Sequence, residues 1–144
     1  MTKRGPDPRT WRGRDPDGRP RQQRPRDALG RPLPFGSEGV EPVSEEPLPP
    51  RQALAYARSL VAQGRAFSAH EVLEARWKAC PEEERDFWQG LAQLCVALTH
   101  HARGNQVGAE RLLDRGAHRL VGYRGETYGV DVATAVAQVR AVVL

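Results

Sequence analysis

The sequence predicts an all-α fold: a single compact bundle of about five helices over residues 51–144, preceded by a disordered N-terminal tail over residues 1–50. Eleven of the 12 prolines precede Arg51, which separates the tail from the rest of the chain. Residues 51–144 show no alternation of apolar and polar side chains, and apolar residues recur there at helical spacing. A segment of this length can bury one modest hydrophobic core.

The tail is rich in arginine and proline and poor in apolar residues. Over residues 1–36, Pro and Gly recur every few positions and Arg alternates with Asp. Such a segment buries too little apolar surface to offset its ordering entropy, so we expect it to be disordered. Its arginines, with Trp11 and Phe35, are compatible with weak binding to RNA, DNA or anionic lipid. The regular Asp residues favour the alternative, a solubilising extension.

Five helices are expected after the tail. They cover residues 50–63, residues 67–79, residues 82–103, a segment from the Asn105 cap to about Val121, and a segment that follows the Asp131 cap. A loop with Gly122, Gly125, Gly129, Tyr123 and Tyr128 precedes the last of them. The connections are short, which predicts antiparallel neighbours. The helix over residues 82–103 has apolar residues in nearly every direction and is therefore expected at the centre.

Several classes of protein are excluded by composition. The chain has 22 Lys and Arg against 18 Asp and Glu, a net charge of +4, and no run of about 18 apolar residues that would span a membrane. It has no apolar segment typical of a secretory signal. Cys80 and Cys95 form no CxxC pair and no disulfide framework, so we expect a reducing, cytoplasmic compartment.

Polar residues interrupt the expected core face of the helix over residues 67–79. With Phe67 taken as the reference direction, His70 and Glu74 fall in the middle of the stripe that should face inward. They are four residues apart and therefore neighbours on one helix face. Glu71 lies at the edge of the same arc.

The next helix carries a matching stripe. Gln89, Gln93 and His100 lie within a narrow arc of a helix that is otherwise apolar. Two polar stripes on consecutive helices are expected to face each other. The predicted polar cluster or pocket therefore consists of His70, Glu71, Glu74, Gln89, Gln93 and His100.

A buried carboxylate costs several kcal/mol unless partners compensate its charge. Three interpretations follow: a self-satisfied hydrogen-bond network, a ligand pocket, or a metal site with His70, Glu74 and His100 as candidate ligands for Zn or Fe. The segment HEVLE lacks the second histidine of HExxH, so it is a weak metal motif. No cofactor is predicted, and a divalent metal remains one of the alternatives.

The stretch from Phe67 to Trp77, with the pattern HxxxExxW, resembles domain-of-unknown-function family number 309, small helical proteins of bacteria and archaea. The resemblance continues through Gln89-Gly90-Leu91, Gln93, His100, Arg103-Gly104-Asn105 and Gly108-Ala109, to the Gly129-Val130-Asp131 turn. It implies an all-helical fold and a shared polar site over about residues 51–143. It implies no particular activity.

Two functions from different classes fit these observations. The first is a non-enzymatic binding or interaction module for a small molecule or a protein partner, with the inward His/Glu/Gln cluster as its site. The second is a metal-assisted, hydrolase-like enzyme that uses Glu71 or Glu74 as the base and the histidines as ligands. The identity of the ligand and the oligomeric state do not follow from the sequence.

Overall fold

The computed structural model describes residues 25–144, and the part of the predicted tail over residues 1–24, with Trp11, lies outside the described residues. Five α-helices, one short 3-10 helix and one two-stranded hairpin make up the described part. In chain order they are α2 (Pro50–Ala62), α3 (Ala66–Ala79), η1 (Glu82–Glu84), α4 (Arg85–Ala102), α5 (Gln106–Arg119), β1 (Glu126–Thr127), β2 (Val130–Asp131) and α6 (Val132–Val143). The predicted all-α fold of about five helices is confirmed.

The helix starts follow local chemistry. Pro50 is the first residue of α2, a position where its missing N–H costs nothing. The Asn105 side chain accepts a hydrogen bond from the Gly108 N–H at the start of α5. Asp131 accepts one from the Thr134 N–H at the start of α6. Both capping residues satisfy N–H groups that the helix itself leaves without partners.

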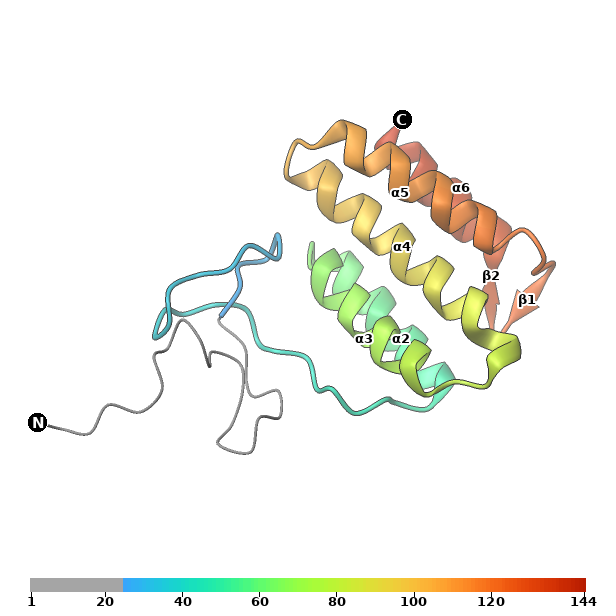
Figure 1. The fold of residues 1–144 in the computed structure, drawn as a ribbon, viewed down its shortest axis with the longest axis horizontal. Helices are drawn as coiled ribbons and strands as arrows, with labels where there is room; N and C mark the ends of the chain where they lie inside the picture. Colours follow the sequence, from blue (N-terminus) through green and yellow to red (C-terminus); the bar gives the residue numbers. More distant parts are fainter. Residues whose placement is uncertain (1–24) are drawn as a thin grey trace, which may run out of the picture.

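Helix α4 lies between α3 and α5 (Figure 1), as expected of the central helix. α2 packs against α3, while α6 packs against α5 and α4. Phe87 and Trp88 of α4 are the two largest fully buried side chains of the core. Helices α4 and α5 approach closely because Gly90 and Gly116 have no side chain. A Cβ at Gly90 would overlap Leu120, and a Cβ at Gly116 would meet the carbonyl oxygen of Gly90.

The loop before α6 contains a short antiparallel hairpin, which the sequence analysis did not predict. Thr127 pairs with Val130, so Tyr128 and Gly129 form a two-residue turn. Their φ angles are 51° and 82°, the left-handed values that allow such a turn to follow the twist of its strands. A non-glycine residue at such a φ costs roughly 1–2 kcal/mol, so contacts elsewhere must hold Tyr128 in place.

Parts of the N-terminal segment between Pro25 and Pro49 contact the helices, while most residues of 31–49 are exposed, and the disorder of residues 1–50 stays a prediction. Arg65 donates to the carbonyl oxygen of Glu41 at 2.6 Å, and Arg103 donates to that of Leu29 at 2.8 Å. Val43 and Leu48 pack against the hydrophobic core. Two of these contacts come from arginines that the helix ends offer to carbonyl groups of the segment, which a composition argument does not count.

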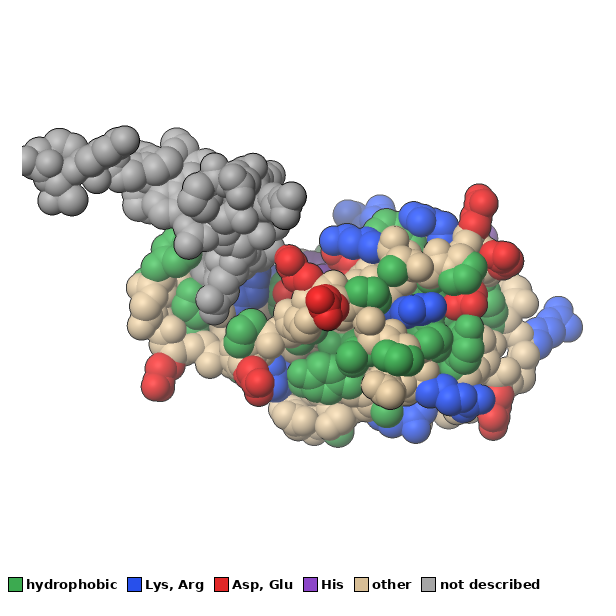
Figure 2. All heavy atoms as spheres, turned by 90° about the horizontal axis from the view of Figure 1, so that it is seen from below, with side chains coloured by type: hydrophobic (Ala, Val, Ile, Leu, Met, Phe, Trp, Pro, Cys, Tyr) green, Lys and Arg blue, Asp and Glu red, His purple; other side chains and the backbone are tan. Residues whose placement is uncertain are grey.

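Basic and acidic side chains are interspersed on the face that Figure 2 shows, with apolar side chains between them. On this face a long polyanion would therefore meet carboxylates as well as basic groups. Within residues 25–144, no helix is both long enough and apolar enough to cross a membrane.

Candidate functional site

The face that α3 turns to the core differs from the one expected. Its buried residues are Ser68, Ala69, Val72 and Leu73, and small side chains among them let α2 and α4 approach. The expected stripe, measured from Phe67 as the reference direction, had His70 and Glu74 in its middle. Phe67 packs against the N-terminal segment, where a Cβ at Gly30 would overlap its ring. The polar residues therefore lie beside the core stripe and not in the middle of it.

His70 and Glu74 are bonded to each other, as their spacing predicted. The Nε2 atom of His70 lies 2.8 Å from Oε2 of Glu74, and the side chains are 18% and 40% exposed. The Nδ1 atom of His70 lies 3.3 Å from the carbonyl oxygen of Phe67. The other Glu74 oxygen lies 3.3 Å from Nζ of Lys78, a partner that the sequence analysis did not assign.

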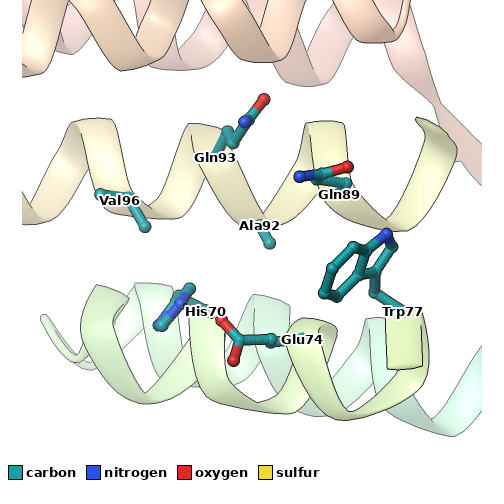
Figure 3. Close-up of a pocket in the computed structure, with 7 residues that line it drawn as sticks. All are labelled: His70, Glu74, Trp77, Gln89, Ala92, Gln93 and Val96. Atoms are coloured by element: carbon teal, nitrogen blue, oxygen red, sulfur yellow. Dashed lines mark hydrogen bonds and ion pairs between the residues drawn. The ribbon is translucent and has the colours of Figure 1, made fainter. Parts of the chain in front are cut away.

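A half-open pocket of about 110 Å³ lies between α3 and α4, beside this pair (Figure 3). α3 contributes the His–Glu pair and Trp77, and α4 contributes the opposite wall. The lining consists of His70, Glu74, Trp77, Gln89, Ala92, Gln93 and Val96. Four of the six predicted site residues are thus brought together. Trp77, Ala92 and Val96 were missed as lining residues, although their helical spacing relative to His70 and Gln89 could have identified them.

The polar atoms of the pocket are incompletely paired. The indole Nε1 of Trp77 and the amide Oε1 of Gln93 are buried and have no hydrogen-bond partner among the described residues. In Figure 3 the Gln93 amide points away from His70. The Gln89 side chain is half-buried and likewise makes no hydrogen bond within residues 25–144. Hydrogen-bonding capacity therefore remains unused around this pocket.

His100, one of the six predicted residues, lies outside the pocket. It sits near the C-terminal end of α4, and the Asn105 side-chain amide donates to its Nδ1 atom at 3.1 Å. Because the Asn105 oxygen already accepts from Gly108, the amide group that faces His100 is the NH₂ group. His100 thus belongs to the turn between α4 and α5.

Glu71 also lies outside the pocket lining. Burial raises the pKa of the Glu71 carboxyl, and the charge of Glu74 adds to this effect. His70, Arg26 and Arg65 oppose it without cancelling it. Arg26 of the N-terminal segment is thus one of the charges that act on Glu71, a relation that the sequence does not reveal.

The three candidate metal ligands are not assembled. Within residues 25–144, no three or more His, Cys, Asp or Glu side chains are grouped so that they could hold a metal ion. His70 and Glu74 are paired, whereas His100 bonds Asn105. The stripe on α4 extends over about 16 Å from Gln89 to His100 at 1.5 Å per residue, so the pocket includes only part of it.

Comparisons with known proteins cover the same helices. Residues 54–112 match the family described as Domain of unknown function (DUF309). A stretch of 48 residues is 50% identical to the "Uncharacterized protein YpuF" of Bacillus subtilis (strain 168), and it covers 33% of this chain and 28% of that protein. The chain thus aligns with less than a third of that relative's length. No solved structure matches the chain.

The matched region includes every residue that lines the pocket, from His70 on α3 to Val96 on α4. It also includes the turn with Asn105, which holds His100. The N-terminal segment and the hairpin with α6 lie outside it. The chain therefore carries a DUF309 domain over residues 54–112.

Proposed function

We propose that this chain is a non-enzymatic binding module that takes a small, uncharged, polar molecule in the pocket between α3 and α4. The observation that carries the proposal is the composition of the pocket wall. Ala92, Val96 and the Trp77 ring supply apolar surface, while the His70–Glu74 pair and Gln89 supply polar groups at its edge. Small-molecule sites typically combine an apolar lining with a few fixed polar groups.

The size of the pocket supports a small ligand. An apolar cavity of about 150 Å³ holds a benzene molecule, and this pocket measures about 110 Å³. A planar molecule of about six non-hydrogen atoms is therefore the expected size for the enclosed part. Larger ligands would extend through the open side.

The charges around the pocket support an uncharged ligand. The Glu74 carboxylate contacts His70 with one oxygen and Lys78 with the other. It is therefore already compensated and would have to give up a partner to bind a cation. The Gln89 amide makes no hydrogen bond within the described part of the chain and can both donate and accept. These groups favour a ligand that carries its own donor and acceptor, such as an amide or a urea.

The metal-assisted hydrolase is not proposed. It would need a third metal ligand close to His70 and Glu74, and His100 is held by Asn105 at the end of α4. No observation on the described residues favours it over the binding module.

A cyclic urea tests the proposal. In a ¹H–¹⁵N NMR titration of the full chain, 2-imidazolidinone should saturably shift the Trp77 indole signal and the amides of Ala92 and Val96. Cyclopentanone, which has the same ring size but no N–H donor, should bind at least several-fold more weakly, because polar groups would lose their partner. Acetate and guanidinium probe whether a charged ligand is preferred, and preference for either would contradict the assignment of an uncharged ligand.

Two matched variants locate the site. Val96→Phe places a large ring at the pocket wall and should abolish the titration, whereas Val107→Phe, on an exposed position of α5, should leave it unchanged. Circular dichroism should show both variants folded. Equal binding by the two variants would place the cyclic urea elsewhere and contradict the proposal.

A further inference from the structure

The N-terminal segment forms a compact turn over residues 25–33. The Leu33 N–H donates to the carbonyl oxygen of Pro25 at 2.7 Å, and an isolated bridge joins Arg26 and Pro32. Inside the turn, the Asp27 side chain accepts from the Leu29 and Arg31 N–H groups at 3.0 and 2.8 Å. The turn is thus held by its own hydrogen bonds and can act as one unit.

This turn lies on Phe67 at the start of α3. Gly30 is buried, has a φ of 79° and faces the Phe67 ring so closely that a Cβ would overlap the ring. Arg103, at the end of α4, donates from Nε to the carbonyl oxygen of Leu29 at 2.8 Å. The turn therefore contacts both helices that form the pocket, at the end where Figure 1 places the N-terminal segment.

Two guanidinium groups flank the Phe67 ring. The Arg26 guanidinium carbon lies 4.8 Å from the ring centroid, and that of Arg103 lies 6.0 Å from it. Both distances are in the range of cation–π attraction. Arg26 comes from the turn and Arg103 from α4, so the orientation of this ring depends on the turn being docked.

Phe67 in turn contacts His70, which lines the pocket. The two ring centroids lie 5.2 Å apart, and the Phe67 carbonyl oxygen lies 3.3 Å from Nδ1 of His70. The opposite ring nitrogen bonds Glu74. A continuous series of contacts thus leads from Gly30 through Phe67 and His70 to Glu74.

We infer that the turn over residues 25–33 is a positioning element for the pocket: by holding Phe67 it orients His70, so that docking of the turn and occupancy of the pocket stabilise each other. Gly30 and Phe67 are positioning residues, because neither lines the pocket. The coupling acts in both directions, so a bound ligand also holds the turn more firmly. The part that concerns ligand affinity rests on the proposed function, while the part that concerns His70 does not.

The chain offers a matched pair of glycines for the test. Gly30→Ala introduces a methyl group into the Phe67 ring, whereas Gly36→Ala changes a glycine of nearly equal φ, 86°, that has no atom within 4 Å of an added Cβ. Both variants carry the same backbone strain, and only the first should displace the turn. In the full chain, Gly30→Ala should therefore speed hydrogen exchange at the Arg103 Nε–H, which donates to Leu29 across the contact, relative to Gly36→Ala.

The decisive readout is the His70 ring. Its ¹H and ¹³C signals at Cε1 should shift in Gly30→Ala and stay at the wild-type position in Gly36→Ala. An unshifted His70 signal together with an undocked turn would overturn the inference. Unchanged exchange in Gly30→Ala would overturn it as well, because the turn would then not be docked through Gly30. Neither measurement uses a ligand.

Ligand affinity provides the second readout. Affinity for 2-imidazolidinone should fall about threefold to tenfold in Gly30→Ala, the range expected when one side chain must be ordered on binding, and remain unchanged in Gly36→Ala. Equal affinity in the two variants would overturn the coupling. If the wild-type chain does not bind the urea at all, the proposed pocket function fails, while the His70 signals still decide whether the turn positions His70.

Discussion

The hydroxyl group of Tyr128 donates a hydrogen bond to the carboxylate of Glu84 at 2.7 Å, although 44 residues separate the two in the chain. The other oxygen of this carboxylate accepts from the Trp88 indole at 2.9 Å. The Tyr128 ring also packs near Phe87 and Trp88, with centroids 6.2 and 6.0 Å apart. These contacts hold Tyr128 in its left-handed conformation and join the hairpin to the first turn of α4.

Tyr128→Phe should lower the free energy of unfolding by about 1 kcal/mol, because it removes a hydrogen bond to a charged, partly buried group and keeps the ring. Chemical denaturation of the wild-type and variant chains measures the difference. Tyr56→Phe is the matched control, since Tyr56 is half-buried and its hydroxyl makes no hydrogen bond within residues 25–144. Equal stability of the two variants would show that the Tyr128–Glu84 hydrogen bond contributes nothing to the free energy of unfolding.

The His70–Glu74 pair should show a measurable but modest coupling. Glu74→Ala should destabilise the chain by about 1 kcal/mol, and Glu74→Gln by less, because glutamine keeps a hydrogen-bond acceptor for His70. The 40% exposure of Glu74 limits the effect, since water screens this pair. In a double-mutant cycle with His70→Ala we expect a coupling of at least about 0.5 kcal/mol. Additive denaturation free energies would mean that the contact contributes nothing to stability.

Contacts between residues close in sequence could be predicted for this site, and contacts between residues distant in sequence could not. The i,i+4 pairing of His70 and Glu74 follows from helix geometry, and so do the helices themselves and the caps at Asn105 and Asp131. Phe67, the reference direction for the predicted stripe of α3, packs against Gly30, which lies 37 residues earlier in the chain. Helical periodicity carries no information about such a contact, so the prediction placed the polar stripe in the face that packs on the core.

The same limit applies to the ends of the bundle. His100 fits the α4 stripe by angle, but its neighbour is Asn105 in the following turn, and not His70. The hairpin was missed because Tyr-Gly is an unusual pair for a turn that favours Asn-Gly. Its stability depends on Glu84, a contact distant in sequence that no local propensity reports.

Replacement of Glu71 should change stability in a pH-dependent way. Burial raises the pKa of this carboxyl above 4.5 in the folded chain, so folding favours the protonated form. The group's contribution to stability is therefore fully present below pH 4.5 and is lost as the pH rises through the folded-state pKa. Glu71→Gln removes this loss, so its melting temperature should exceed that of the wild type at pH 8 and approach it at pH 4.

Thermal melts at the two pH values measure this effect, with Glu38→Gln, at an exposed position of the N-terminal segment, as the control. The control should follow the wild type at both pH values. A Glu71→Gln variant that is less stable than the wild type at pH 8 would show that the ionic contacts with His70, Arg26 and Arg65 outweigh burial, which contradicts the direction of the shift.

The two cysteines should differ sharply in reactivity towards thiol reagents. Burial on α4 raises the pKa of the Cys95 thiol to about 12, so its reactive thiolate form is scarce at pH 8 and little exposed. Cys80 is half-buried at the end of α3, where partial burial and the Glu84 charge raise its pKa, and its thiol donates to the Trp77 carbonyl oxygen at 3.3 Å.

Iodoacetamide at pH 8 should therefore modify Cys80 slowly and Cys95 only at the rate of unfolding. Mass spectrometry of the native chain should show a single modification. The native Cys80→Ser variant should show none, and the same variant in denaturant should be modified at Cys95. Two modifications at equal rates in the native chain would mean that α4 opens readily, which its fully buried Phe87 and Trp88 side chains should prevent.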